Sequence, residues 1–230
     1  MSENVHKKER VHLKNIREEL RAKQVILFII GLFVMGLGIV LIKKANLGLS
    51  PISAIPAAVS NIVPLTFGNV TIIFQCCCFA AIMLATKKLT WKRAIILPVG
   101  FGIGYILDLY NFLLHFDHAP VWGKIIICML GIMCTALGIV IIKRAEFVLP
   151  AADELWFVLS HKYNRKVSQF KTAGDIAWVV ITVIIEVAAI HKVVSVGIGT
   201  VLSMLLTGFF VGKFQKYLPT RNKQAQNHIR

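Results

Sequence analysis

The sequence is poor in charged residues, and acidic residues are the scarcer sign. Only 16% of the 230 residues are charged, and 11 Asp and Glu stand against 26 Lys and Arg, which gives a formal net charge of +15. No HExxH, GxSxG or P-loop motif occurs, and no CxxC pair is found among Cys76, Cys77, Cys78, Cys128 and Cys134. These absences argue against an enzyme, a metal site and a bound cofactor.

Long uncharged runs dominate what remains. Hydrophobic residues make up 57% of the chain. Six stretches of the length that spans a bilayer core, about 20 residues, are nearly free of charge: Val25–Ile42, Thr66–Thr86, Ala94–Leu114, Ile125–Ile142, Ala173–His191 and Ser195–Gly212. Helices satisfy every backbone polar group internally in lipid. The predicted fold class is therefore all-α, a polytopic membrane protein with six transmembrane helices.

The cations fall mainly on one side of such a chain. With the N-terminus inside, the cytoplasmic tails and the loops 87–93 and 143–172 hold 22 Lys and Arg, whereas the outer segments hold four. Counting 46–64 and 146–160 as two further spans leaves 17 inside and nine outside, which is a weaker bias. Because positive loops stay cytoplasmic, we expect both termini in the cytoplasm. The charge then has a topological cause, and nucleic acid is not an expected partner.

The two ends of the chain are expected to lie outside the bilayer core. In residues 1–24, Leu13, Ile16 and Leu20 recur at helical spacing among seven cations. This pattern predicts a short amphipathic helix that lies on the anionic inner leaflet. Residues 213–230 are predicted to form a basic cytoplasmic tail.

One stretch of the sequence occurs twice. Residues 36–60 read "GLGIVLIKKANLGLSPISAIPAAVS" and residues 136–160 read "ALGIVIIKRAEFVLPAADELWFVLS". Without gaps, 25–49 and 125–149 share ten of 25 residues, including two glycines at the same seven-residue interval. We predict two three-helix repeats, 25–114 and 122–212. Because three is odd, the second repeat begins on the opposite side of the membrane, so the repeats are inverted.

Each repeat contains an apolar segment that proline interrupts. Pro51 and Pro150 remove backbone donors and oppose a continuous span. The segments 46–64 and 146–160 are expected to be re-entrant or to form short helices at the membrane edge, and the sequence leaves both readings open. Gly48 and Ser50 belong to the first of these segments.

Two lines of sequence resemble a known bacterial family. "ANLGLSPISAIPAAVS" supplies Ala45, Leu47, Gly48, Pro51 and Ser60, and "VGIGTVLSMLLTGF" supplies Gly197, Gly199, Thr200 and Gly208. The chain is similar in these residues to the YitT/YczE-like integral membrane proteins, over residues 25–215. The resemblance implies their membrane fold, and it matches Asp108 and Glu186 to acids that the family tends to carry.

The chain also departs from that family. Ile52-Ser53 stands where the resemblance implies a Trp-Asp pair, and Phe147-Val148 stands where it implies Leu-Gly. Both departures lie within the two proline-interrupted segments. The resemblance to this bacterial family also implies that the chain lies in the inner membrane of a bacterial cell.

Four acids are candidates for a solute or ion pathway. Asp108 and Glu186 lie inside spans, where a charged side chain usually faces the bundle or a wet path. We hypothesise that one of them binds a proton or cation coupled to solute movement. The alternative is a structural hydrogen bond or an ion pair with Lys43, Lys44 or Lys192. Asp153 and Glu154 follow Pro150 and either line a cytoplasmic vestibule or act as acids in the first turn of a helix.

Small residues at four-residue steps predict close helix packing. These residues are Gly100 and Gly104 in the third span and Gly199, Ser203 and Thr207 in the sixth. Gly68-Asn69 and Gly174-Asp175 are read as the matching openings of the second and fifth spans, with Asn69 and Asp175 as helix caps.

The sequence supports two classes of function. The preferred one is a secondary transporter of a small solute, with the site between the two interrupted segments. The other is a non-transporting membrane module that docks a partner, such as the substrate-binding subunit of a larger importer or an assembly or regulatory factor. A homodimer is compatible with both.

Overall fold

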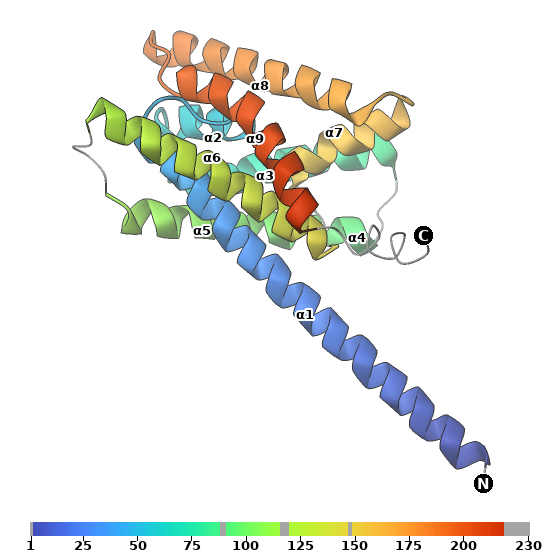
Figure 1. Ribbon diagram of the computed structural model, residues 1–230. Coiled ribbons are helices and arrows are strands. Elements are labelled where there is room, and N and C mark those ends of the chain that lie inside the picture. Colours follow the sequence, from blue (N-terminus) through green and yellow to red (C-terminus); the bar gives the residue numbers. More distant parts are fainter. Residues whose placement is uncertain (1, 88–90, 116–119, 147–148, 219–230) are drawn as a thin grey trace.

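The computed structural model describes residues 2–87, 91–115, 120–146 and 149–218, without the side chains of 2–21, 91, 92 and 168. The described residues fold into helices joined by short turns (Figure 1). In chain order these are α1 (Ser2–Ala45), α2 (Pro51–Ser60), α3 (Phe67–Thr86), α4 (Trp91–Ala94), α5 (Ile96–Leu113), α6 (Val121–Arg144), α7 (Ala151–Lys162), α8 (Val167–Ile190) and α9 (Ile198–Tyr217).

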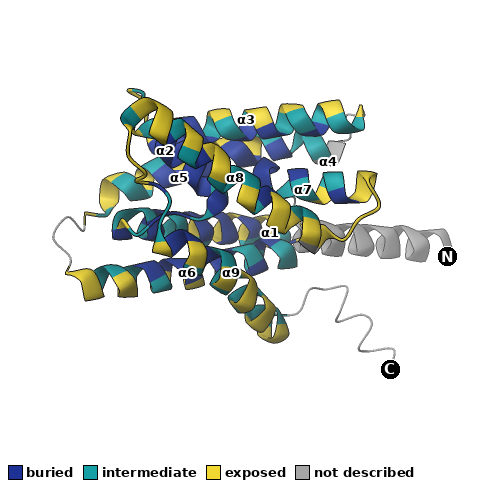
Figure 2. Cartoon of the chain, turned by 90° about the horizontal axis from the view of Figure 1, so that it is seen from above, coloured by how far each residue is buried: buried dark blue, intermediate teal, exposed yellow. Residues whose placement is uncertain are grey.

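Six of the described helices are long and apolar enough to cross a membrane. They are Ala22–Ala45 within α1, α3, α5, α6, Gln169–Ile190 within α8, and α9. Their outer faces carry exposed apolar side chains such as Leu84 (78% exposed), Phe112 and Leu205, which a lipid environment would cover (Figure 2). The prediction of an all-α polytopic membrane protein with six spans is confirmed.

The spans differ from the predicted runs mainly at their ends. Helix α1 begins at Ser2 without a break, so residues 2–24 continue the first span instead of forming a separate helix. The side chains of residues 2–21, which were expected to contact the membrane surface, are outside the described part of the chain. Phe147-Val148 and residues 219–230 of the basic tail are also outside it. Helix α8 begins at Val167, so Gly174-Asp175 lies two turns inside it. The prediction that Asp175 caps this helix is therefore wrong.

The proline-containing segments form the two short helices. Helix α2 begins at Pro51, whose fixed φ suits a first helical position, and it continues through Pro56. Helix α7 follows Pro150 directly. Each packs on a long helix of the other half: α2 lies on α8, and α7 lies on α3. Ala54, Ala58 and Ala152 of these short helices are fully buried.

Helices α1 and α6 form the centre of the bundle (Figure 1). Their glycines admit the side chains of the opposing helix. A Cβ at Gly31 would lie 2.7 Å from Ile142 Cγ1, and a Cβ at Gly131 would lie 2.7 Å from Ile42 Cγ1. Gly38 faces Thr135 in the same way that Gly138 faces Met35. Along this contact the residue numbers rise in α1 and fall in α6, so the two helices are antiparallel.

The two lines that carry the family resemblance touch each other. Gly48 has φ of +101°, and a Cβ there would lie 2.7 Å from Thr200 Oγ1, so only glycine fits without strain. The Leu49 N–H donates to the Ser195 carbonyl at 2.9 Å, and the Gly199 N–H donates to the Leu47 carbonyl at 2.7 Å. These bonds fix the chain that leads into α2 against the start of α9.

Candidate functional site

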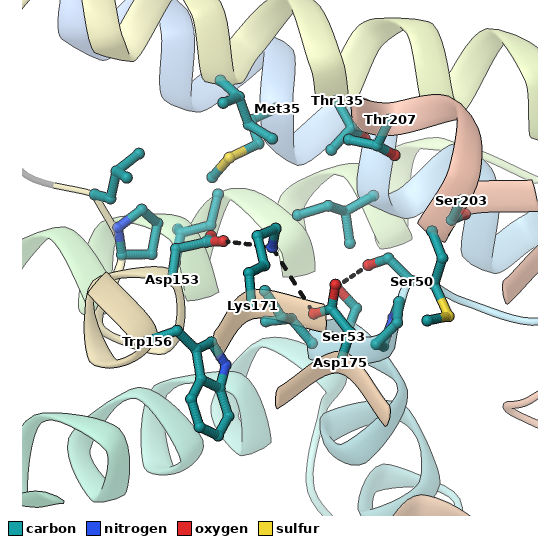
Figure 3. Close-up of a pocket in the computed structure, with 18 of the residues that line it drawn as sticks. Met35, Ser50, Ser53, Thr135, Asp153, Trp156, Lys171, Asp175, Ser203 and Thr207 are labelled. Carbon is teal, nitrogen blue, oxygen red and sulfur yellow. Dashed lines mark hydrogen bonds and ion pairs between the residues drawn. The ribbon is translucent and has the colours of Figure 1, made fainter. Parts of the chain in front are cut away.

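A cavity of about 480 Å³ lies between the two short helices and the long ones (Figure 3). The first turn of α2 contributes Ser50, Pro51, Ile52 and Ser53 to its wall, and the start of α7 contributes Pro150 and Asp153. Because the first N–H groups of a helix have no partner within it, both short helices present partial positive charge near this cavity. The site is thus built around two helix starts.

Four charged residues line the cavity. Lys171 of α8 lies between Asp153 of α7 and Asp175 of α8 (Figure 3). Its ammonium is 3.5 Å from one Asp153 oxygen and 3.8 Å from one Asp175 oxygen, and its side chain remains 51% exposed. Lys143 of α6 completes the set. Two cations and two carboxylates make the lining formally neutral, with both signs available to a solute.

Gln75 positions the start of α7. This side chain lies buried on α3, and its amide oxygen accepts a hydrogen bond from the Ala152 N–H at 3.0 Å. The bond satisfies one of the free donors in the first turn of α7. At the other short helix, Ser50 donates from its hydroxyl to the Ser53 hydroxyl at 3.2 Å and does not cap a backbone N–H. Pro51 has no N–H and the Ser53 N–H donates to the Ser50 carbonyl at 2.9 Å, so the Ile52 N–H is the free backbone donor of this turn.

Aromatic rings form the wall next to the charged cluster. Trp156 of α7 lines the cavity, and its ring centre is 5.3 Å from that of Trp178 on α8. The Trp178 ring in turn meets the Phe74 ring edge to face at 5.2 Å. Gly174 makes room for this cluster, since a Cβ there would lie 2.6 Å from Trp156 Cζ2. The aromatic packing holds α7 against α3 and α8.

The lining residues are related by a constant spacing in the sequence. Nine pairs of them are separated by 100 positions. The pairs are Met35 with Thr135, Ile39 with Ile139, Ser50 with Pro150, Ser53 with Asp153, Pro56 with Trp156, Thr71 with Lys171, Gln75 with Asp175, Ile103 with Ser203, and Leu107 with Thr207. The two halves of the chain therefore contribute corresponding positions to one cavity.

The cavity brings together only part of the residues that the sequence singles out. It is lined by Ser50, Pro51, Pro150, Asp153, Ser203 and Thr207. Its wall does not include Gly48, Asp108, Glu154 or Glu186. Their assignment to a solute pathway stays a prediction.

Asp108 binds the start of α3. One of its carboxylate oxygens accepts from the Gly68 N–H at 2.7 Å, and the other accepts from the Thr66 hydroxyl. The Thr66 oxygen also accepts from the Asn69 N–H at 3.1 Å, so Thr66 is the cap of α3. Asn69 therefore donates its backbone N–H to this cap, and the prediction that it acts as the cap is wrong.

Glu186 binds the turn between α8 and α9. Its side chain is fully buried, and its carboxylate accepts from the Val194 and Ser195 N–H groups, each at 2.9 Å. Charged acceptors form strong hydrogen bonds with backbone donors in such surroundings. The predicted alternative of a structural hydrogen bond for Glu186 thus has specific backbone donors.

The predicted packing glycines lie at close contacts, Gly100 and Gly104 with α3 and Gly199 with the chain that precedes α2, and the packing role of Ser203 and Thr207 stays a prediction. Gly104 faces Ile72, and a Cβ there would lie 2.8 Å from the Gly68 carbonyl oxygen. A Cβ at Gly100 would lie 3.0 Å from the Gln75 Cβ, and one at Gly199 would lie 2.7 Å from the Gly48 carbonyl oxygen. Gly100 therefore leaves room for the side chain that holds α7.

The cavity residues that sequence reasoning missed include Gln75, Lys143, Trp156, Lys171 and Asp175. Lys171 was interpreted as a topology determinant, and Asp175 was aligned with Asn69 as a cap. Extending the ungapped spacing of 100 beyond position 149 would have paired Gln75 with Asp175 and Thr71 with Lys171. In the described residues no three His, Cys, Asp or Glu side chains are grouped as metal ligands.

Comparisons with known proteins place the chain in a family. It is 24% identical over 204 residues to "Uncharacterized protein YyaS" of Bacillus subtilis (strain 168), an alignment that covers 85% of this chain and 96% of that protein. No solved structure matches it significantly. Residues 22–216 match the model of a family described as "Family of unknown function (DUF6198)". The chain therefore belongs to the DUF6198 family.

Proposed function

We propose that this polytopic membrane protein is a secondary transporter of a small solute and that the central cavity is its solute site. The observation that carries the proposal is the cavity itself, which lies at the starts of two short helices and is lined by nine residue pairs with a spacing of 100. Interrupted segments in corresponding positions of two repeats are typical of transporter binding sites.

The contacts between α1 and α6 support inverted repeats. Gly31 meets Ile142 while Gly131 meets Ile42, and Gly38 meets Thr135 while Gly138 meets Met35. Each contact recurs with the two halves exchanged, which is the pattern that a two-fold axis between antiparallel helices produces. Lys43 and Lys143 are equivalent by this spacing and lie at opposite ends of the helix pair. An axis in the membrane plane relates the halves in this proposal.

The packing of the short helices supports the same relation. Helix α2 of the first half lies on α8 of the second, and α7 of the second half lies on α3 of the first. The left-handed residues Asn46 and Glu146 after α1 and α6 also correspond, with φ of 53° and 56°. Each half therefore needs the other to complete its fold, and the cavity lies where they exchange helices.

We also propose that the DUF6198 family is related to the YitT/YczE-like proteins. The hydrogen bonds between the 47–49 and 195–199 segments give the two resembling lines a shared structural role. In this proposal Asp108 and Glu186 hold the ends of helices around the site, and the solute meets Asp153, Lys171 and Asp175.

A transporter exposes its site to each side of the membrane in turn, and this can be tested without knowing the solute. In a chain whose five cysteines are replaced by alanine, Thr207→Cys places one thiol on the cavity wall. A membrane-impermeant thiosulfonate should modify it both in right-side-out and in inverted vesicles. Ile73→Cys, which faces outward on α3 away from its ends, is the matched control and should react in neither.

Reaction of Thr207→Cys from one side only would overturn the transporter. That result would favour the other class of function, a membrane module that docks a partner. Flux of a solute in liposomes that contain only this protein would support the transporter directly.

A further inference from the structure

Three buried polar atoms on the cavity wall lack a hydrogen-bond partner. They are the hydroxyl of Ser203, one carboxylate oxygen of Asp175 and the indole nitrogen of Trp156. Ser203 is only 2% exposed. Since an unpaired buried polar atom is unfavourable, these atoms indicate a ligand that supplies the missing partners.

The three atoms require partners of opposite kinds. Asp175 carries a carboxylate and therefore needs a donor, whereas the Trp156 N–H needs an acceptor and the Ser203 hydroxyl has its proton to donate. The oxygen of Asp175 without a hydrogen bond, Oδ1, forms an ion pair with the Lys171 ammonium at 3.8 Å, and the closer pairing of Lys171 is with Asp153 at 3.5 Å. A solute ammonium at Asp175 would leave that pairing intact.

The start of α2 supplies one donor for an anionic group. Ser50 does not cap this turn, Pro51 has no N–H and the Ser53 N–H donates to the Ser50 carbonyl, so the Ile52 N–H is free. A free N–H at a helix start attracts carboxylates and phosphates. Together with the Ser203 hydroxyl, it provides donors for a solute carboxylate.

Apolar side chains also line the cavity. Ile103, Leu107 and Met35 are the first-half counterparts of the polar residues Ser203, Thr207 and Thr135. Phe74 and Ile39 add to this apolar surface. The cavity thus offers apolar surface as well as polar groups.

We propose that the solute is a small amphiphilic zwitterion: an ammonium binds Asp175, a carboxylate binds the Ser203 hydroxyl and the Ile52 N–H, and an apolar body lies against Met35, Ile103 and Leu107. This inference rests on the proposed function, which assigns the cavity to the solute. A volume of about 480 Å³ suits a molecule of amino-acid size, since it falls in the lower part of the range of ligand pockets, about 300–1,000 Å³.

The test measures binding to the purified full-length chain in nanodiscs by calorimetry. Two zwitterions, L-leucine and L-phenylalanine, are compared with molecules that have the same hydrocarbon group and only one of the two charges. Isopentylamine and phenethylamine keep only the amine, and 4-methylpentanoate and 3-phenylpropionate keep only the carboxylate. The zwitterions should bind, and the four singly charged molecules should not.

Two variants connect this binding to the named atoms. Asp175→Asn should weaken it by about 10- to 100-fold, because it removes a charged hydrogen bond, and Ser203→Ala should weaken it by about 3- to 10-fold. Ser195→Ala is the matched control, since Ser195 is also buried with an unpartnered hydroxyl but does not line the cavity. Ser195→Ala should bind the zwitterions as tightly as the unmodified chain does. This result would show that the loss of a buried hydroxyl does not by itself weaken binding.

The outcomes separate this inference from the transport proposal. Binding of a singly charged molecule as tightly as its zwitterion, or no binding by either zwitterion, would overturn the inference. Unchanged affinity in Asp175→Asn would overturn it as well. Zwitterion binding with no flux in liposomes would overturn transport and leave the ligand class standing.

Discussion

Asp108 and Glu186 illustrate how a single acidic residue can have a structural role inside a membrane protein. Each carboxylate accepts hydrogen bonds from the backbone at a helix boundary, Asp108 at the start of α3 and Glu186 in the turn before α9. In lipid the free N–H groups of such a boundary have no water to bind, so a charged acceptor is especially favourable there. These acids therefore accept hydrogen bonds from backbone N–H groups that would otherwise have no partner.

Replacing Glu186 with Gln should destabilise the protein. The amide keeps the shape but retains one acceptor oxygen, and its NH₂ group faces the Val194 or Ser195 N–H. We expect a loss of about 1–3 kcal/mol, seen as a lower midpoint of thermal unfolding in detergent. Glu146→Gln, at an exposed position, is the control and should leave the midpoint unchanged. Normal stability of Glu186→Gln together with lost uptake would contradict a structural role and support the ion-coupling hypothesis.

The side chains of the cavity could be predicted only in part. Pro150 and Asp153 stood out because proline and acid are rare in an apolar run, and the structure places both on the wall. Lys171 and Asp175 did not stand out, because a charged side chain near the end of an apolar run is usually exposed to water. Here tertiary structure keeps them together, since the start of α7 folds back over the first turns of α8.

At the scale of helices, the contact between α1 and α6 depends on residues without side chains. A Cβ at Gly38 would lie 2.6 Å from the Gly131 carbonyl oxygen and also clash with the Thr135 backbone. Small residues let membrane helices approach closely, where van der Waals packing drives their association. The reciprocal glycines thus determine the distance between the two halves.

Gly38→Ala should separate these helices and destabilise the fold. Overpacking of a close contact typically costs about 1–3 kcal/mol, and backbone atoms on the other side cannot move aside as a side chain can. Gly102→Ala is the matched control, since a Cβ there meets nothing within 4 Å. Thermal unfolding of both variants in detergent checks the prediction. Equal midpoints would show that α1 and α6 do not depend on this contact.

The helices themselves were the most predictable part of the fold. Bilayer thickness fixes the length of an apolar run, so hydropathy located all six spans. Their boundaries were less predictable. Helix α8 begins at Val167, six residues before the predicted run, because Gln169 and Lys171 are polar and still helical. The cavity gives Lys171 an environment that hydropathy does not include.

For the whole molecule, the exchange of short helices between the halves links topology to function. Helices α2 and α7 start at the same cavity, although they belong to halves whose first helices are antiparallel. If the axis between the halves lies in the membrane plane, the two short helices approach the cavity from opposite faces. The orientation of the chain then decides which side the Lys143 and Lys171 end of the cavity faces.

The distribution of cations predicts that orientation. With 22 Lys and Arg on one side and four on the other, the 87–93 loop should be cytoplasmic and the 191–194 segment should face outward. An epitope tag inserted in each can be tested with protease. In intact spheroplasts the 191–194 tag should be cleaved and the 87–93 tag protected, and inverted vesicles should give the reverse. Cleavage of both tags from the same side would contradict the six-span topology, because an odd number of spans separates them, and the inverted repeats would then lose their basis.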